Sequence, residues 1–507
     1  MKKYLVLFIA FYSVAISNCY AQNKSGNTWV FGLCGTKATF TDTSRPVTDT
    51  LYALLTPANY PFMFTKGHSN ICDSATGKLL FACNGMRIYD TIGDIIENAD
   101  SLQPNLIYNH YCCPSNALTT QGSIILPKGS SGLYYIFTPT MTDSAYTANV
   151  TGGQSRVPFD LMQYHVVDMN ANAGMGKVVQ KNIELLTNVE MAKAGMMACR
   201  HANGYDWWLL KQGLDTNIIY TFLVTADTVE LKLTQGFSAP KFSYYDLTGQ
   251  ACFSTDGSKY AFVQGIDKKL FLADFDRCTG ILSNPKSIKI PLDSTTHPFY
   301  QSMGILDSLL NGICFSPNDS FLYITRRYNI YQYELNEPDS ALAWYLVKHG
   351  EDTTLQQFAY YGQLQLGIDN RIYIGKGGGT ANQNSVIDKP NIKGIGCEFC
   401  RKCLRYDYGC ATTSPPNMPN FNLGAKVPCW PLESSEITDK NSEFEVYPNP
   451  ASGNLYISNA DKKEKEIYNS VGQLMLSTFS NEIDIHNLSS GVYYLKVENT
   501  VKKIVIE

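Results

Sequence analysis

The sequence has few charged side chains, and those present form no block of one sign. Asp, Glu, Lys and Arg make up 17% of the 507 residues, and the formal net charge is −4. Typical soluble domains contain about 25% charged residues. A protein that follows a phosphate backbone needs a basic stripe or patch. We therefore expect no nucleic acid among the partners of this protein.

Long apolar runs are missing after the first residues. A membrane-spanning helix needs about 20 consecutive apolar residues, and the chain after residue 21 has no such run, so we predict no transmembrane segment. The chain begins MKKYLVLFIAFYSVAISNCYA. Lys2 and Lys3, the following apolar stretch and the small residues ending at Ala21 predict a signal peptide over residues 1–21, cleaved after Ala21. A second interpretation makes Cys19 a lipidated N-terminus.

No group of residues has the spacing of a known catalytic or metal site. The segment DMNANAG from Asp168 resembles half a calcium loop, but Ala173 stands where such a loop requires glycine. Ser254-Thr-Asp-Gly resembles an aspartate box with one residue missing, and His201 precedes an Asn-Gly turn. We interpret all three as turn chemistry. The sequence thus predicts no catalytic residue, no cofactor and no metal site.

The chain does contain a repeated hairpin. Between Gln250 and Pro291 four short apolar runs are separated by turns, the first of them at Asp256-Gly257. An Asp-Gly pair between apolar runs is a strong hairpin signal, because glycine tolerates the positive φ of a primed turn. The four expected strands are Ala251–Phe253, Lys259–Val263, Leu270–Phe275 and Ser287–Ile290. Four strands per roughly 40–60 residues, repeated, predict a β-propeller.

Similar turn signals recur along residues 22–431, the expected propeller domain. They begin at Cys72, Pro127, Cys199, Cys252, Cys314 and Gln365. Blade length favours seven blades, although six remain open. A seventh blade could combine Trp29–Phe31 with the segment that ends near Phe421. Such an exchange of strands between the two ends of the domain would close the ring and remove an exposed sheet edge.

The repeats resemble the Tol-B-type propeller repeat, in which F-S-P-D-G precedes an apolar strand. FSTDGSKYAF begins at Phe253 and FSPNDSFLYI at Phe315. The order of segments from Trp29 to Phe421, including GQLQLGIDNRIYIGKG at Gly362, is similar to a propeller of exported Bacteroidota proteins. The resemblance implies a seven-bladed propeller, and it implies no known reaction.

The C-terminal region has a pattern of its own. A polar linker over residues 432–442 precedes short alternating strands and turns over residues 443–507, which predict a small β-sandwich. This tail closely resembles the C-terminal sorting domain of the type IX secretion system. The resemblance rests on Tyr447, Pro448, Asn449, Pro450, Gly453, Gly472, Gln473, Gly491, Tyr493, Lys502 and Lys503. It implies binding to the secretion machinery and delivery, through the periplasm, to the outer cell surface or the medium.

Cysteine is abundant, with 15 residues in two groups. Cys72, Cys199, Cys252 and Cys314 occupy one phase of four repeats, which favours buried thiols, because a disulfide requires Cα atoms within about 7 Å. The second group comprises Cys397, Cys400, Cys403, Cys410 and Cys429. Thiolates at this spacing can hold a metal, but an oxidising compartment favours disulfides. Five is an odd number, so Cys34 or Cys278 is the expected additional partner.

Two functions are compatible with these features. The first is a non-enzymatic propeller outside the cell that binds a protein or glycan ligand. The alternative is a polysaccharide hydrolase or lyase with paired carboxylates at the propeller channel. Facing carboxylates in a pocket would favour the enzyme, and a channel without them would favour binding.

Overall fold

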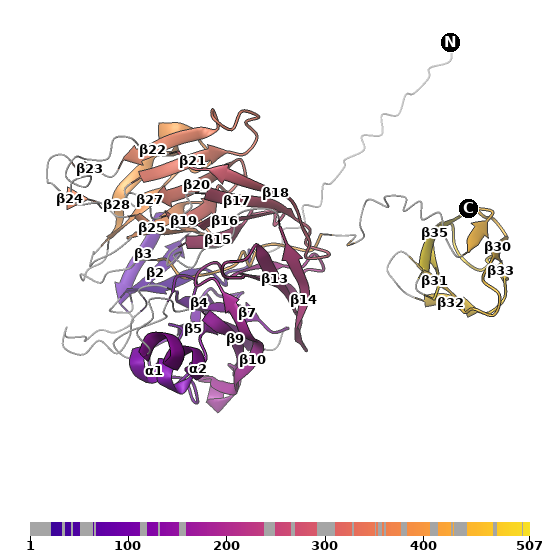
Figure 1. Cartoon of the computed structure of the whole chain (residues 1–507), viewed down its shortest axis with the longest axis horizontal. Coiled ribbons are helices and arrows are strands. Elements are labelled where there is room, and N and C mark those ends of the chain that lie inside the picture. The colour runs from indigo at the N-terminus through magenta and orange to yellow at the C-terminus, as the bar shows by residue number, and fades with distance from the viewer. Residues whose placement is uncertain are drawn as a thin grey trace, which may run out of the picture. The chain divides into compact units, whose positions relative to one another are not determined.

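A computed structural model of the chain gives two compact units, Met1–Cys429 and Trp430–Glu507, and each is described by itself (Figure 1). The described residues are 22–32, 36–41, 44–50, 64, 67–111, 119–129, 132–151, 159–237, 249–264, 269–291, 310–326, 329–349, 351–352, 357–358, 361–376, 383–405, 414–426, 429, 444–469, 474–498 and 500–507. The expected signal peptide lies outside them. Within these ranges, no helix has the length and apolar character needed to span a membrane.

The first unit is a β-propeller, as predicted. Its described residues form seven antiparallel sheets of three or four strands that follow one another along the chain (Figure 1). The sheets are β1 (Thr28–Phe31), β2 (Thr36–Thr41), β3 (Ser44–Thr50); β4 (Ser69–Cys72), β5 (Leu79–Cys83), β6 (Ile88–Tyr89); β7 (Ile124–Pro127), β8 (Leu133–Thr140), β9 (Phe159–Asp168), β10 (Lys177–Met191); β11 (Met197–Arg200), β12 (Trp207–Gln212), β13 (Ile218–Val224), β14 (Val229–Gly236); β15 (Gly249–Phe253), β16 (Lys259–Gln264), β17 (Lys269–Phe275), β18 (Leu282–Lys289); β19 (Leu310–Phe315), β20 (Phe321–Arg326), β21 (Asn329–Glu334), β22 (Trp344–His349); and β25 (Tyr361–Leu366), β26 (Ile372–Lys376), β27 (Gln383–Ile387), β28 (Phe399–Arg405).

Short elements fill the connections. They are α1 (Asn105–Tyr111), α2 (Asp143–Tyr146), η1 (Thr147–Thr151), η2 (Asn172–Gly174), the hairpin β23 (Glu351–Asp352) and β24 (Gln357–Phe358), and η3 (Gly394–Cys397). The predicted hairpin at Asp256-Gly257 is present, with Gly257 at φ 73°. Its fourth strand starts at Leu282 rather than at Ser287.

The innermost strands are β1, β4, β7, β11, β15, β19 and β25. Among them β1 contacts β4, β4 contacts β7, and β11, β15, β19 and β25 contact one another in succession. Amide side chains connect them across blade boundaries. The Gln250 amide in β15 accepts hydrogen bonds from the backbone N–H groups of Ile313 (3.1 Å) and Leu364 (3.0 Å), and it donates to the Leu364 carbonyl (2.6 Å). An amide carries both a donor and an acceptor, so one side chain satisfies backbone groups of two further blades.

The ring closes by side-chain packing between its first and last sheets. The ring of Trp29 in β1 lies 5.3 Å from that of Tyr373 in β26, and the Arg45 guanidinium pairs with the Asp388 carboxylate. The expected strand exchange is therefore wrong. Among the described residues, strand β1 pairs with β2 alone, and those near Phe421 form no strand. Pro415, Pro416 and Pro419 explain this, because proline has no N–H to donate to a strand ladder.

The second unit is the small β-sandwich that the sequence predicts. One sheet contains β29 (Glu445–Tyr447), β30 (Asn454–Ser458) and β33 (Glu482–Asp484). The other contains β31 (Lys465–Asn469), β32 (Leu474–Thr478), β34 (Gly491–Val497) and β35 (Thr500–Ile506). Leu455, Ile467, Leu495 and Ile504 are fully buried between the two sheets. Burial of aliphatic side chains from both inner faces stabilises such a sandwich.

Candidate functional site

Residues 414–426, which we name the channel segment, pass through the centre of the propeller. Asn417 fixes the segment where the innermost strands begin. Its side-chain amide donates to the carbonyls of Ser123 (3.0 Å) and Met196 (3.2 Å) and accepts from the Gln121 amide (3.0 Å). Its backbone N–H donates to the His68 carbonyl at 2.8 Å. One buried asparagine therefore contacts three blades.

The same segment emerges where the innermost strands end. The Asn420 amide donates to the Thr255 carbonyl at 2.8 Å, just after β15. The Lys426 backbone N–H donates to the Ala202 carbonyl at 2.8 Å, just after β11. The Arg277 guanidinium donates to the carbonyls of Arg200 and Gly424. The channel segment thus connects blades that lie far apart in the sequence, without joining any sheet.

A disulfide fixes the chain just beyond this segment. Cys278, in the turn after β17, is bonded to Cys429, and the two residues are 151 positions apart in the sequence. In the chain-entropy account, a cross-link that closes so long a loop restricts the unfolded chain strongly. The bond attaches the chain that follows the channel segment to the fifth blade, which is the sheet of β15, β16, β17 and β18.

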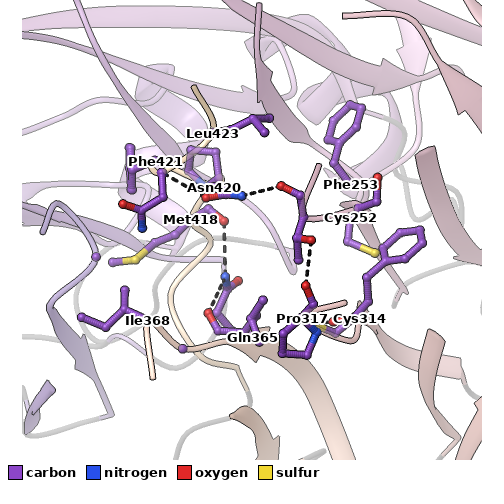
Figure 2. Close-up of a pocket in the computed structure, with 18 of the residues that line it drawn as sticks. Cys252, Phe253, Cys314, Pro317, Gln365, Ile368, Met418, Asn420, Phe421 and Leu423 are labelled. Carbon is purple, nitrogen blue, oxygen red and sulfur yellow. Dashed lines mark hydrogen bonds between the residues drawn. The ribbon is translucent and has the colours of Figure 1, made fainter. Parts of the chain in front are cut away.

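A pocket of about 490 Å³ opens beside the channel segment, at the ends of β11, β15, β19 and β25. Its volume lies within the range of small-molecule sites. Figure 2 shows Met418, Phe421 and Leu423 of the segment on one side of the pocket, and Cys252 and Pro317 on the other. The pocket is therefore built from the blades and from the chain that fills their channel.

None of the described residues that line this pocket has a charged side chain. Cys199, Cys252 and Cys314 are its ionisable members, and burial raises the pKa of the Cys199 and Cys314 thiols to about 12 and that of Cys252 well above its usual value. Thiols with raised pKa values are poor nucleophiles and poor metal ligands. No three His, Cys, Asp or Glu side chains in the described residues are grouped to bind a metal.

Charges near the pocket are held by the scaffold. The Asp319 carboxylate accepts hydrogen bonds from the Thr255 backbone N–H (2.7 Å) and hydroxyl (2.6 Å), and from the Asp256 backbone N–H (3.1 Å). Burial raises the pKa of Asp319 and outweighs these donors. The carboxylate ties the turns of two neighbouring blades together and positions Thr255 at the pocket edge.

Several carboxamides face the pocket with hydrogen-bonding capacity to spare. The exposed Asn370 side chain makes no hydrogen bond within the described part of the chain. Asn422, also exposed, accepts from the Asn23 N–H at 2.8 Å and keeps its amide donors for another group. The hydrogen bonds of the Gln365 amide to other described residues are long, at 3.4 Å to the Met418 carbonyl and 3.5 Å to that of Leu366 (Figure 2).

The two predicted cysteine groups differ in their bonding. Cys72, Cys199, Cys252 and Cys314 are buried free thiols at or near the ends of β4, β11, β15 and β19, as the repeat phase predicts. In the second group Cys400 is bonded to Cys403, and Cys429 to Cys278. Cys397 is instead a free, buried thiol among the described residues. Cys34 and Cys410 lie outside those residues.

The turn motifs found in the sequence have structural roles. His201 accepts from the Asn203 N–H at 3.0 Å, and its other ring nitrogen lies 3.1 Å from the Cys278 carbonyl. Asp168 accepts from the Asn170 N–H at 2.8 Å, and Asp256 from the Ser258 N–H at 2.8 Å. Each closes its own turn, and Ser254 and Thr255 of the third motif also line the pocket.

The sorting-motif residues divide into structural and exposed positions. The Asn449 amide donates to the Lys503 carbonyl (2.9 Å) and accepts from the Val505 N–H (2.8 Å), which fixes the last strand. The buried Tyr493 hydroxyl donates to the Ser489 carbonyl (2.9 Å), and Lys502 packs on Phe444. Tyr447 and Lys503 are exposed. Pro448 and Pro450 flank Asn449, Gly453 precedes β30, Gly491 is the first residue of β34, and Gly472 and Gln473 lie outside the described residues.

Sequence reasoning missed the pocket carboxamides and the channel segment. Asn and Gln in turns are common, so no local pattern marks Asn370 or Gln365 as pocket residues. The channel segment left a usable signal, since SPPNMPNFNL combines several prolines with apolar residues. Such a run cannot form a strand and is too apolar for an exposed loop.

Comparisons with solved structures give distant similarities only. A putative 6-phosphogluconolactonase from Bacteroides uniformis aligns over 76% of this chain and 97% of its own, with 10% identity and a TM-score of 0.42. A periplasmic gluconolactonase from Pseudomonas aeruginosa aligns over 82% of this chain and 94% of its own, with 11% identity and a TM-score of 0.37. The Dos1 propeller aligns over 69% and 90%, with 10% identity and a TM-score of 0.35. These similarities carry no functional argument.

Sequence comparison identifies the tail. No curated protein matches the chain. A family model described as a secretion system C-terminal sorting domain matches residues 445–507. The match covers the tail only, so the Tol-B-type assignment of the repeats stays a prediction. The protein is a β-propeller that carries a type IX secretion C-terminal sorting domain, and it is exported to the cell surface or the extracellular space.

Proposed function

We propose that this protein is an exported binding protein whose ligand enters the pocket beside the channel segment. The observation that carries the proposal is the lining of that pocket, which combines unengaged carboxamides with apolar side chains and includes no charged residue. Such a site offers hydrogen bonds and apolar contact, the two features of binding pockets. It offers no acid, base or activated nucleophile.

The alternative, a polysaccharide hydrolase or lyase, needs a pair of carboxyl groups that flank the scissile bond. No lining residue in the described ranges provides one, and the nearby Asp319 is engaged by Thr255 and Asp256. Binding is therefore the better function for this pocket. We assign residues 22–431 to the binding domain, 432–442 to the linker and 443–507 to the sorting domain, behind a signal peptide over residues 1–21.

The pocket wall is held in position by the propeller scaffold. Met418 is buried in the channel. The Asn420 amide donates to the Thr255 carbonyl, and the Gly424 carbonyl accepts from Arg277. A preorganised wall reduces the entropy lost on binding. This arrangement supports recognition of a ligand that fits a fixed shape.

The test is a ligand-observed NMR screen of small neutral and charged compounds against the mature full-length chain, its Ile368→Trp variant and an Ile281→Trp control. Ile368 lines the pocket, and the larger indole should fill it. Ile281 is 44% exposed and lies outside the pocket lining. We expect compounds that bind wild type and Ile281→Trp but lose binding to Ile368→Trp. Equal binding to both variants, or no binding by any compound, would refute the proposal.

A further inference from the structure

The pocket carboxamides come from separate parts of the fold, and Gln22 and Gln250 are among them. Gln365 is in β25, and Asn370 is in the turn that follows it. Asn420 and Asn422 belong to the channel segment. Segments that are distant in the sequence therefore bring amide side chains to one cavity.

Carboxamides select ligand groups that both donate and accept. Each amide has two N–H donors and a carbonyl acceptor, whereas a carboxylate only accepts and an ammonium only donates. A charged ligand would lose its hydration here without meeting an opposite charge, at a large cost in free energy. The lining therefore favours a neutral ligand with many hydroxyl or amide groups.

The shape of the site favours a compact ligand over an extended chain. Peptides are usually bound along a sheet edge or a groove, where their backbone groups form a row. Here the amides surround one cavity of about 490 Å³, and Ile368, Met418 and Leu423 provide apolar surface between them. A sugar ring has polar groups around its edge and apolar C–H faces.

We propose that the pocket binds an uncharged saccharide. The inference rests on the proposed function and names the ligand class of the same site. Hydroxyl groups of the sugar would exchange hydrogen bonds with Asn370, Asn422 and Gln365, and its C–H face would contact Ile368 and Leu423. Charged sugars are excluded because the lining residues offer no opposite charge.

The test compares sugars that differ in charge. Binding of the mature full-length chain to N-acetylglucosamine, glucosamine and glucuronate is measured by saturation-transfer NMR, with neutral hexoses and a neutral tripeptide alongside. We expect the neutral sugars to bind, and the ammonium and carboxylate sugars to bind at least tenfold more weakly. Preference for a charged sugar or for the tripeptide overturns the inference.

A matched pair of variants locates the binding. Asn370 has a φ of 61°, so Asn370→Gly removes the amide in a backbone conformation that glycine adopts without strain. Asn172 has a φ of 53°, is also exposed and lies away from the pocket, so Asn172→Gly is the control. Loss of one hydrogen bond should weaken sugar binding about threefold to tenfold in Asn370→Gly and leave the control unchanged.

The outcomes separate the two proposals. If non-sugar compounds bind in a manner that Ile368→Trp abolishes, while no neutral sugar binds, the saccharide inference fails and the proposed function stands. If neither sugars nor other compounds bind in an Ile368-dependent manner, both fail. Equal sugar binding by Asn370→Gly and wild type refutes the part assigned to that residue.

Discussion

Replacing Asn417 by alanine tests whether the channel segment holds the propeller together. The side chain is 6% exposed and makes hydrogen bonds to Ser123, Met196 and Gln121. A typical intramolecular hydrogen bond contributes about 0.5–1.5 kcal/mol net, and buried partners left unsatisfied cost more. Asn417→Ala should therefore lower the free energy of unfolding by about 2–4 kcal/mol. The backbone N–H bond to His68 survives in the variant, so the segment keeps one attachment.

The assay is urea unfolding of the mature chain followed by tryptophan fluorescence. Four of the five tryptophans, Trp29, Trp207, Trp208 and Trp344, lie in the first unit, so the signal reports mainly on the propeller. Asn420→Ala is the control, because this exposed side chain donates one hydrogen bond to Thr255 and accepts one from the Asn422 N–H, and losing these exposed bonds should cost only about 1 kcal/mol. Equal midpoints for Asn417→Ala and wild type, with equal slopes, would refute a locking role for the segment.

Three further predictions follow from buried, bonded or separable parts of the chain. Burial lowers the pKa of Lys211 from 10.5 to about 7, so above pH 7 the unfolded chain binds a proton that the folded chain does not. Unfolding free energy should therefore rise with pH from 7 to about 8, below the range in which buried thiols with raised pKa values, such as Cys199 and Cys314, act in the opposite direction, and Lys211→Met should remove most of that slope. A slope that persists in the variant would contradict this account. Reduction of the Cys278–Cys429 bond should lower stability by about 2–5 kcal/mol, and Cys278→Ser should lose this sensitivity to reductant; peptide mapping without reduction should recover the pair. Deletion of Glu443 to Glu507 should leave a folded propeller in the periplasm, since the two units are compact by themselves; wild-type levels of the truncated protein in the medium would exclude a sorting role.

Local patterns were sufficient to predict the blades and the tail. The Asp256-Gly257 pair between apolar runs specifies a hairpin through glycine's tolerance of positive φ, and the structure has that hairpin. The tail pattern likewise predicted a sandwich. Both signals lie within a few residues of the strands they organise. Blade structure therefore follows from short-range chemistry that a sequence displays directly.

The features that the sequence did not predict depend on contacts between residues that lie far apart in the chain. The closure of the ring depends on the packing of Trp29 against Tyr373, and the attachment of the channel segment depends on the hydrogen bond between Asn417 and Gln121. The partners of each pair are hundreds of residues apart, and neither pair has a distinctive local pattern. Prolines in the channel segment were the missed clue, because they exclude the strand pairing that we expected there. The pocket could not be predicted for the same reason, since its lining comes from five blades and this segment.

The channel segment both stabilises the propeller and forms part of the pocket wall, and residues at its two ends serve these two roles. Asn417, at one end, is buried and fully engaged, so changes there should alter stability before they alter binding. Asn422, at the other end, is exposed, and among the described residues its side chain bonds to the Asn23 N–H alone, so changes there should alter binding with little effect on stability. Additivity is expected for side chains that share no partner. A double variant should therefore show the stability loss of Asn417→Ala together with the binding loss of Asn422→Ala. A strong coupling between the two positions would mean that the segment moves as a rigid unit and that ligand binding strengthens its attachment to the propeller.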